Sequence, residues 1–240
     1  MTDKYGNDNI YESWSDNNIF GPISKMLLDP LYNMKLTPNM ITIISTIFTL
    51  LSIYYLHKSS HKHNIWFYAA ITSYLFGYTL DCVDGKMARK YNMGSDIGIA
   101  LDMVSDNISN MLLLIYIVTT YKMNKNNIIV LIIAIVLTYY LTLAYGLNEA
   151  ISSYKATGSD NFYERRVIQL EKYLNNKDTP LYQVLLYKSF LYITKSAYSI
   201  YKYNFTQYDE NIINKKLSTI KEFGPGNFAL YMSVILLSLN

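Results

Sequence analysis

Long apolar runs without charge restrict the fold of this chain more than any other feature. A helix needs roughly 20 apolar residues to cross a bilayer core. Two uncharged runs, 41–56 and 64–80, approach that length, and the second reaches it if its helix continues into the residues that follow. Two further runs, 97–121 and 128–146, have the same character, although acidic residues interrupt the first of them near its start. We therefore expect an all-α, polytopic membrane protein.

The composition supports this interpretation. Hydrophobic residues make up 51% and charged residues 16% of the chain, whereas a soluble domain has roughly 25% charged residues. The formal net charge of +3 is too small and too scattered to indicate nucleic-acid binding. Cys82 is the only cysteine, which excludes an intramolecular disulfide. The Cys82 thiol lies beside Asp81 and could be read as a metal ligand. Because a hard cation held by carboxylates prefers oxygen ligands, a packing role is favoured for the thiol.

The first part of the chain is polar. Residues 1–18 form a polar tail, and 19–36 mix apolar and charged residues in the pattern of a helix that lies on the membrane surface. Thr37 and Pro38 then provide a cap and a first residue for a helix. We interpret 19–240 as a single membrane domain.

The last third is harder to interpret. The charged stretch 148–180 is expected outside the membrane, with some helix, and 224–239 is expected to form a short last apolar helix. Between them, 181–203 is rich in Leu, Tyr and Ile. Its three lysines recur every seven residues and share one helical stripe; they are Lys188, Lys195 and Lys202. Either this segment is a fifth span whose lysines face a polar cavity, or it lies flat in the interface. About six spans in total are preferred.

Four aspartates are concentrated where two of the apolar runs meet: Asp81, Asp84, Asp102 and Asp106. Charges at such positions are costly and usually functional. The spacing of three in the first pair and four in the second places each pair on one helical face. If the two helices pack side by side, the four carboxylates converge. Two divalent cations would balance them, and such a pair clamps a phosphoryl group during in-line displacement.

Small and basic residues accompany the aspartates. Gly98 leaves bare backbone on the same stripe as Asp102, and Gly85 removes a side chain where a ligand must approach closely. Arg89 can form paired hydrogen bonds with a phosphate, and Lys86 can add a point charge. These residues favour an anionic, phosphate-containing ligand.

With Ala88, these residues form the pattern D-x2-D-G-x2-A-R-x8-G-x3-D-x3-D from Asp81 to Asp106. The pattern resembles the signature of the class I CDP-alcohol phosphotransferase family. Residues 37–42 are similar to the segment that opens the first membrane helix in many members, and the resemblance covers about residues 20–147. It implies a six-helix membrane enzyme of phospholipid synthesis that displaces CMP from a CDP-linked donor with an alcohol hydroxyl, using two Mg²⁺ or Mn²⁺ ions.

The same resemblance assigns roles to individual residues. It implies that Asp81, Asp84 and Asp102 hold the metal ions, and that Asp106 both lies near the metal and acts as the catalytic general base. The residues implied to contact the nucleotide or its phosphates are Gly85, Lys86, Ala88, Arg89, Gly98 and Asn39.

The donor and the acceptor stay open. Residues 101–106 look like the corresponding run of phosphatidylinositol synthases, whereas 84–86 and 38–42 look closer to choline and ethanolamine phosphotransferases. Asn107 stands where inositol enzymes tend to carry a basic residue. The donor is therefore CDP-diacylglycerol or CDP-choline/ethanolamine, and the acceptor an alcohol such as inositol, glycerol phosphate or diacylglycerol.

Two other functions use similar residues. An intramembrane Mg²⁺-dependent prenyltransferase also has paired aspartate-rich motifs, but its chemistry does not require Gly85, Arg89 and Gly98 in this register. A cation channel or transporter with an acidic site would bind metal without binding a nucleotide. Protection by CMP against thermal unfolding distinguishes such a channel or transporter from an enzyme that binds a CDP-linked donor.

Basic residues at the membrane boundary predict the orientation. Lys86, Arg89 and Lys90 lie where the apolar run ends, and basic loops favour the cytosolic side. We expect a multi-pass protein whose active site faces the cytosol. Its expected partners are the CDP-linked donor, the alcohol and membrane lipids, and the sequence leaves open whether it forms a homodimer.

Overall fold

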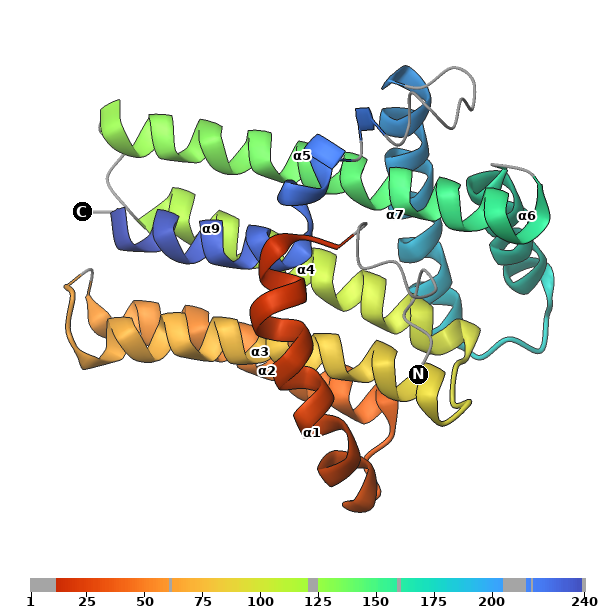
Figure 1. The fold of residues 1–240 in the computed structure, drawn as a ribbon, viewed down its shortest axis with the longest axis horizontal. Helices are drawn as coiled ribbons and strands as arrows, with labels where there is room; N and C mark the ends of the chain where they lie inside the picture. Colours follow the sequence, from red (N-terminus) through yellow and green to blue (C-terminus); the bar gives the residue numbers. More distant parts are fainter. Residues whose placement is uncertain are drawn as a thin grey trace. The chain divides into compact units, whose positions relative to one another are not determined.

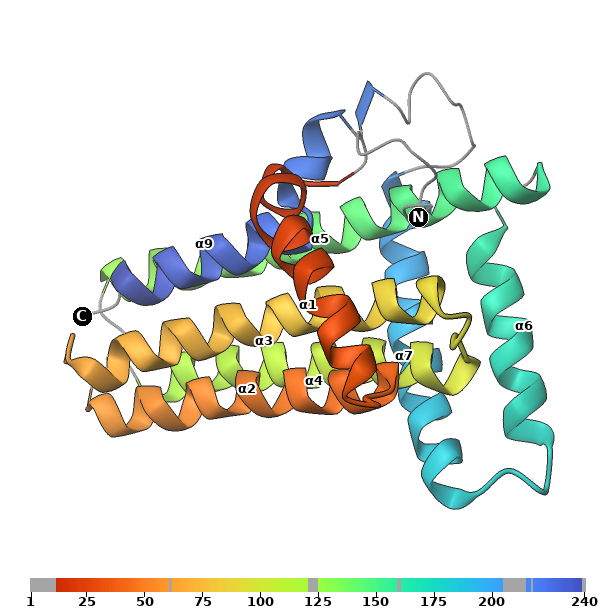
Figure 2. The same cartoon turned by 60° about the horizontal axis from the view of Figure 1, so that its bottom comes forward.

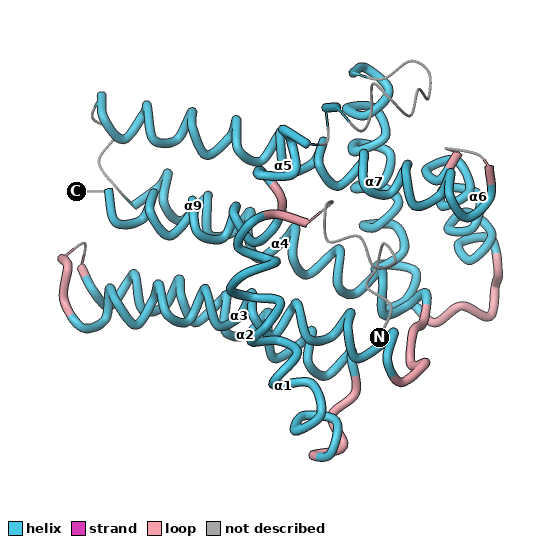
Figure 3. Tube along the Cα trace, in the orientation of Figure 1, coloured by secondary structure: helices cyan, strands magenta, loops and turns pink. Residues whose placement is uncertain are grey.

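The computed structural model describes residues 12–60, 62–120, 125–158, 161–204, 215–216 and 218–238. In these residues every regular element is a helix and no strand occurs (Figure 3), which confirms the all-α prediction. The chain divides into two compact units. We call Trp14–Leu137 with Pro225–Asn240 the site unit, and Thr138–Gly224 with the residues before Trp14 the hairpin unit. The single-domain interpretation of 19–240 stays a prediction.

The site unit contains three long helices that alternate in direction along the chain (Figures 1 and 2). The elements of this unit are η2 (Asp16–Phe20), α1 (Gly21–Asn33), α2 (Pro38–Ser59), α3 (Ile65–Lys90), α4 (Asp96–Thr120), the first part of α5 (Lys125–Thr157) and α9 (Pro225–Ser238). Both α1 and α9 pack against α3, and α2 packs against α3 and α4.

The start of α2 follows the predicted chemistry. Pro38 is its first residue, and the Thr37 hydroxyl accepts a hydrogen bond from the Met40 amide at 3.3 Å. Before it, the segment predicted to lie on the membrane surface is helical over η2 and α1. In this segment Leu28 is buried while the Met26 side chain is 77% exposed. The amphipathic pattern is thus present, and the location of α1 on a membrane surface stays a prediction.

Small residues allow α2 and α3 to approach closely. A Cβ atom at Gly77 of α3 would lie 2.9 Å from the Thr49 hydroxyl and 3.0 Å from the Ser45 carbonyl oxygen of α2. The Ser73 hydroxyl donates to the Phe48 carbonyl at 2.8 Å across the same contact. Close contacts between small residues are a common way for helices to associate in membranes. They fix the register of α3, which carries the first two aspartates.

Three helical segments in the described residues are long and apolar enough to cross a membrane: Pro38–Ser59, Asp96–Thr120 and Ile132–Ala150. They match three of the four predicted runs, and the membrane-protein class is confirmed. The fourth run, 64–80, forms the first part of α3. Neither α3 nor α7 is among these three candidate spans. The last apolar helix, α9, is shorter than a typical span. The predicted count of about six spans is therefore not confirmed.

The hairpin unit contains the rest of α5, α6 (Phe162–Asn175), α7 (Leu181–Asn204) and η3 (Lys221–Phe223). Its core is formed by α5 residues Leu143 and Leu147 with Tyr163 of α6 and Tyr201 of α7. The helix of α5 continues to Thr157, well beyond the apolar run that ends at 146. The end of the apolar run therefore does not coincide with the end of the helix.

Candidate active site

The turn between α3 and α4 brings the aspartates together. Asn92 adopts a left-handed backbone (φ 52°), and the Met93 amide donates to the Ala88 carbonyl at 2.9 Å. This is the bond pattern with which helices commonly end. Ser95 then caps α4, because its hydroxyl accepts a hydrogen bond from the Gly98 amide at 3.1 Å. The two helices consequently run antiparallel, with the end of α3 beside the start of α4.

Three of the four predicted metal ligands converge. One carboxylate oxygen from each of Asp81, Asp102 and Asp106 lies within 4.8 Å of the other two, and all three residues are partly buried. The Oδ1 atom of Asp81 is buried and has no hydrogen-bond partner in the described residues. A buried carboxylate oxygen without a donor is costly. Because carboxylates are the ligands that Mg²⁺ and Mn²⁺ prefer, the group fits a divalent cation.

Asp84 has a different environment. Its carboxylate is 5% exposed, and its Oδ2 atom lies 2.5 Å from the hydroxyl of Thr42 on α2. The Thr42 hydroxyl also lies 3.1 Å from the Pro38 carbonyl oxygen. Asp84 therefore lies outside the group of three, on the side of α3 that faces α2. Its predicted role as a metal ligand stays a prediction.

Two of the predicted phosphate-binding residues lie against each other on α3. A Cβ atom at Gly85 would be 3.3 Å from a terminal nitrogen of Arg89, so the guanidinium lies over the bare backbone one turn earlier. The Lys86 ammonium donates to the Cys82 carbonyl at 3.4 Å. Ala88, as described above, accepts the bond that closes the end of the helix. Both cations are thus on the last turns of α3, next to the aspartates in sequence.

The other two predicted contact residues, Asn39 and Gly98, meet between α2 and α4. A Cβ atom at Gly98 would lie 2.7 Å from the Asn39 Oδ1 atom and 3.0 Å from the Ser95 hydroxyl oxygen. The absence of a side chain at Gly98 therefore makes room for the Asn39 amide. The sequence predicted that both residues contribute to one site, and it gave no reason to expect this contact.

Three polar residues that the sequence analysis did not single out support the aspartates. Besides Thr42, the Tyr74 hydroxyl of α3 donates to the Asn110 Oδ1 atom of α4 at 3.1 Å. The Asn110 side-chain amide donates to the Asp106 carbonyl at 2.9 Å. Tyr74 lies two helical turns before Asp81, and Asn110 one turn after Asp106. Polar residues at these helical spacings in apolar helices are the signal that could have identified them.

The end of α3 is attached to α1. The Lys90 ammonium and the Tyr91 hydroxyl both donate to the Asp29 carboxylate, the latter at 2.6 Å. The Tyr32 and Tyr91 rings stack with centroids 3.6 Å apart. These hydrogen bonds, first the one from Lys90 and then the one from Tyr91, hold the pKa of Asp29 below its usual range. The contact fixes α1 beside the turn that organises the aspartates.

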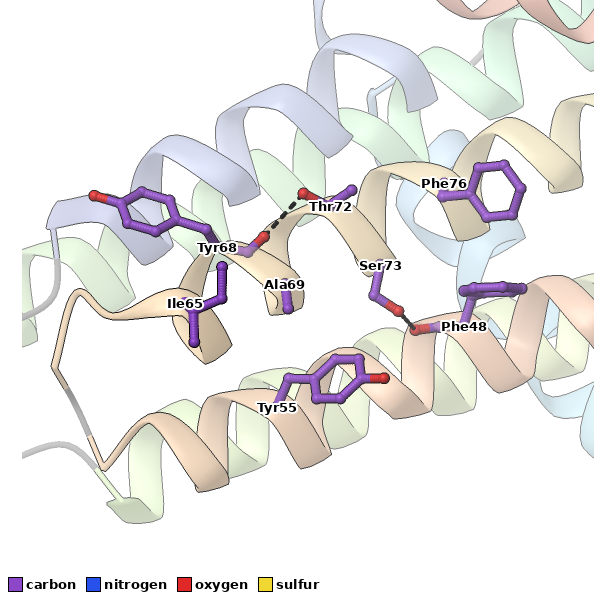
Figure 4. A pocket seen from close by; sticks show the side chains of 8 residues that line it. All are labelled: Phe48, Tyr55, Ile65, Tyr68, Ala69, Thr72, Ser73 and Phe76. Atoms are coloured by element: carbon purple, nitrogen blue, oxygen red, sulfur yellow. Dashed lines mark hydrogen bonds between the residues drawn. The ribbon is translucent and has the colours of Figure 1, made fainter.

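A separate groove lies between α2 and α3, in the half of α3 that precedes the aspartates. It has a volume of about 390 Å³ and is mostly apolar; it is lined by Phe48, Tyr55, Ile65, Tyr68, Ala69, Thr72, Ser73 and Phe76 (Figure 4). The hydroxyls of Thr72 and Ser73 donate to backbone carbonyls at 2.9 and 2.8 Å. The groove therefore offers apolar surface and few polar groups for a substrate.

Comparisons with known proteins agree with the family resemblance found in the sequence. Residues 35–162, more than half of the chain, match the family model for CDP-alcohol phosphatidyltransferases. The matched region contains the whole site described above. No solved structure matches the chain.

Two similar curated proteins are named as inositol enzymes. The CDP-diacylglycerol–inositol 3-phosphatidyltransferase of Saccharomyces cerevisiae is 28% identical over 155 residues, which are 65% of this chain and 64% of the relative. A probable CDP-diacylglycerol–inositol 3-phosphatidyltransferase 2 of Arabidopsis thaliana is 43% identical over 49 residues, 20% of this chain and 22% of the relative. The chain thus aligns with less than two thirds of the length of each.

Proposed function

The chain belongs to the CDP-alcohol phosphatidyltransferase family, and on this premise we propose that it is a phospholipid-synthesising enzyme in which an alcohol hydroxyl displaces CMP from a CDP-linked donor. The observation that carries the proposal is the convergence of Asp81, Asp102 and Asp106 at the junction of α3 and α4, inside the matched region. Neither a prenyltransferase nor a cation channel or transporter requires Gly85, Arg89 and Gly98 at these spacings.

We propose CDP-diacylglycerol as the donor and inositol as the acceptor. The relatives named above support this choice, since both are named for these two substrates. The run 101–106 favours it as well, because of its likeness to phosphatidylinositol synthases. Choline and ethanolamine donors are the alternative to be tested, since 84–86 and 38–42 look closer to enzymes that use them.

The proposed metal ligands are Asp81, Asp84, Asp102 and Asp106. Divalent ions bound there would neutralise the diphosphate and stabilise the negative charge that develops on the transferred phosphoryl group. Thr42 restrains the carboxylate of Asp84 by a hydrogen bond, so that this ligand is oriented before the donor binds. Asn110, held by Tyr74, bonds to the backbone carbonyl of Asp106 and so restrains the α4 backbone there.

The proposed reaction requires one base. Asp106 accepts the proton of the alcohol hydroxyl, and the alcohol oxygen forms a bond to the phosphorus that carries diacylglycerol. The bond from that phosphorus to the bridging oxygen breaks, and CMP leaves with the electron pair. Arg89 and Lys86 would bind phosphate oxygens by charge-assisted hydrogen bonds. Gly85, Ala88, Gly98 and Asn39 would form the surface against which the cytidine part lies.

The membrane supplies the lipid substrate directly. The aspartates lie at one end of α3 and α4, so the diphosphate of a lipid donor can reach them while its acyl chains stay in the bilayer. We propose that this end faces the cytosol, because Lys86, Arg89 and Lys90 belong to it.

The proposal is tested by reconstituting the protein in vesicles with Mg²⁺ and measuring CMP release. CDP-diacylglycerol is offered with inositol, glycerol phosphate or no alcohol, and CDP-choline is offered with diacylglycerol. We expect CMP release and labelled phosphatidylinositol with the first pair alone. Release with CDP-choline and diacylglycerol, and none with CDP-diacylglycerol, would replace the proposed substrates. Absence of CMP release and of stabilisation by CMP would overturn the enzyme assignment.

A further inference from the structure

Helix α7 packs against a strongly charged helix. In the hairpin unit the Lys195 ammonium donates to Glu171 of α6 at 3.1 Å, and the rings of Tyr173 and Tyr187 stack with centroids 5.1 Å apart. The Tyr198 hydroxyl also donates to a carboxylate of α6. The charged residues of α6 are Glu164, Arg165, Arg166, Glu171 and Lys172. If α7 crossed the bilayer, α6 would carry these charges into the hydrocarbon region, where each is expensive.

The exposed face of α7 combines apolar and basic side chains. Leu181, Leu185 and Tyr192 are 75%, 59% and 76% exposed, and at 100° per residue they lie on one side of the helix. Lys188 and Lys202 lie along the edge of this stripe and are exposed too. An apolar stripe edged by lysines is typical of a helix that lies in the membrane interface, with its ammonium groups near lipid phosphates.

The direction in which α5 crosses the membrane determines on which side α7 begins. Helix α4 begins beside the aspartates and ends at Thr120, about 27 Å further along its axis than Asp102 at 1.5 Å per residue. Only four residues separate Thr120 from the start of α5 at Lys125. Helix α5 therefore begins on the side of the membrane opposite the aspartates. When α5 has crossed, the chain emerges on the aspartate side.

Helix α9 begins beside the middle of α3, about one turn from Asp81, and the chain enters it from the aspartate side. Its Gly226 amide donates to the Asp16 carboxylate at 3.1 Å, and the same carboxylate accepts from the Tyr78 hydroxyl at 2.7 Å. Tyr78 lies one turn before Asp81 on α3. From there α9 runs toward the end of the site unit where α2 finishes and α3 begins (Figures 1 and 2).

A chain that leaves α5 and enters α9 on the same side must cross the membrane an even number of times in between. In the described residues of this interval, α7 is the one helix long enough to cross, since α6, with 14 residues, spans only about 21 Å. For the described residues of this interval the even number is therefore zero. We propose that α7 is not a membrane span and lies along the membrane surface on the aspartate side, bound to anionic lipid headgroups through Lys188 and Lys202.

The sidedness is tested with single cysteines in a Cys82→Ala background. Leu181→Cys and Tyr203→Cys mark the two ends of α7, Gly94→Cys marks the aspartate side, and Lys62→Cys marks the opposite side. Sealed vesicles are treated with a membrane-impermeant maleimide before and after permeabilisation. We expect both ends of α7 to label with the sidedness of residue 94. Labelling of residue 203 with the sidedness of residue 62 would overturn the proposal.

The lipid contact is tested with an environment-sensitive fluorophore on Tyr192→Cys in the same background. Phosphatidylcholine vesicles are compared with phosphatidylcholine–phosphatidylserine vesicles. We expect blue-shifted emission in the anionic vesicles, reversed by high salt. The variant Lys188→Ala/Lys202→Ala should lose the shift, and the matched variant Lys172→Ala/Lys177→Ala, with the same charge change outside α7, should keep it. Emission that is equal in both vesicles, or equal loss in both variants, would refute binding to anionic lipid.

Discussion

The Thr42 hydroxyl lies 2.5 Å from the Oδ2 atom of Asp84, and both side chains are buried between α2 and α3. Thr42→Val keeps the shape of the side chain and removes this hydrogen bond. Loss of a residue that orients a metal ligand typically costs about 10- to 100-fold in metal affinity or activity. We expect a reduction of that size in CMP release, with a higher Mg²⁺ requirement, and recovery in Thr42→Ser.

Thr46→Val is the matched control, because in the described residues the Thr46 hydroxyl donates to the Thr42 carbonyl one turn earlier on α2 and to no aspartate. It should change the Mg²⁺ requirement little. An unchanged Mg²⁺ titration in Thr42→Val would show that Asp84 needs no orientation by α2.

The sequence predicted the faces of the helices better than the directions of their side chains. The spacings Asp81–Asp84 and Asp102–Asp106 placed each pair on one face, and three of the four carboxylates do converge. Asp84 turns toward Thr42, which is 42 residues earlier in the chain. Periodicity within one helix contains no information about a donor on another helix, so this contact could not be predicted.

The fold was predictable to a similar degree. The apolar runs predicted α2, α4 and the apolar part of α5, and Thr37 with Pro38 predicted where α2 begins. The pairing of α6 with α7 was not predictable, because the pattern within each helix does not show which helix it will face; Tyr173 of α6, for example, stacks on Tyr187 of α7.

Gly98→Ala should impair the enzyme more than Gly94→Ala. A Cβ atom at residue 98 would be 2.7 Å from the Asn39 Oδ1 atom, whereas at residue 94 nothing lies within 4 Å. A displacement of about 1 Å near reacting groups can cost about 100-fold in rate. We expect turnover in Gly98→Ala to fall about 10- to 100-fold, and to be nearly normal in Gly94→Ala. Equal rates in the two variants would show that the contact with Asn39 does not position the site.

Acid should release α1 from the end of α3. Because the folded-state pKa of Asp29 is lowered, its contribution is complete above the pKa of the unfolded chain, about 3.9, and is lost as the pH falls through the lowered value. In a Cys82→Ala background, spin labels at Lys25→Cys and Gly94→Cys should give one narrow distance at neutral pH and a broad distribution at a pH below the lowered pKa of Asp29. Asp29→Asn should broaden the distribution at neutral pH. A narrow distribution in that variant would show that other contacts hold α1.

Removal of divalent metal should abolish CMP release. The carboxylates of Asp81, Asp102 and Asp106 repel one another at their observed separation, and metal ions are the compensating charge that the site can hold. Treatment with EDTA should stop the reaction, and Mg²⁺ or Mn²⁺ should restore it, while Ca²⁺ controls for charge alone. Full activity in EDTA would reject the metal-dependent mechanism.

Substitution of single aspartates should separate metal binding from proton transfer. Asp81→Asn, Asp84→Asn and Asp102→Asn each remove a proposed metal ligand, so both nucleotide affinity and turnover should fall, and excess Mg²⁺ should recover some activity. Asp106→Asn also removes the proposed base, and loss of a general base alone costs roughly 10²- to 10⁴-fold in rate. In this variant nucleotide binding should survive better than turnover. Binding is measured independently of rate, by the rise in melting temperature that CMP produces with Mg²⁺ present. Near-normal turnover in Asp106→Asn would show that this residue is not the base, because an amide cannot accept the proton of the alcohol.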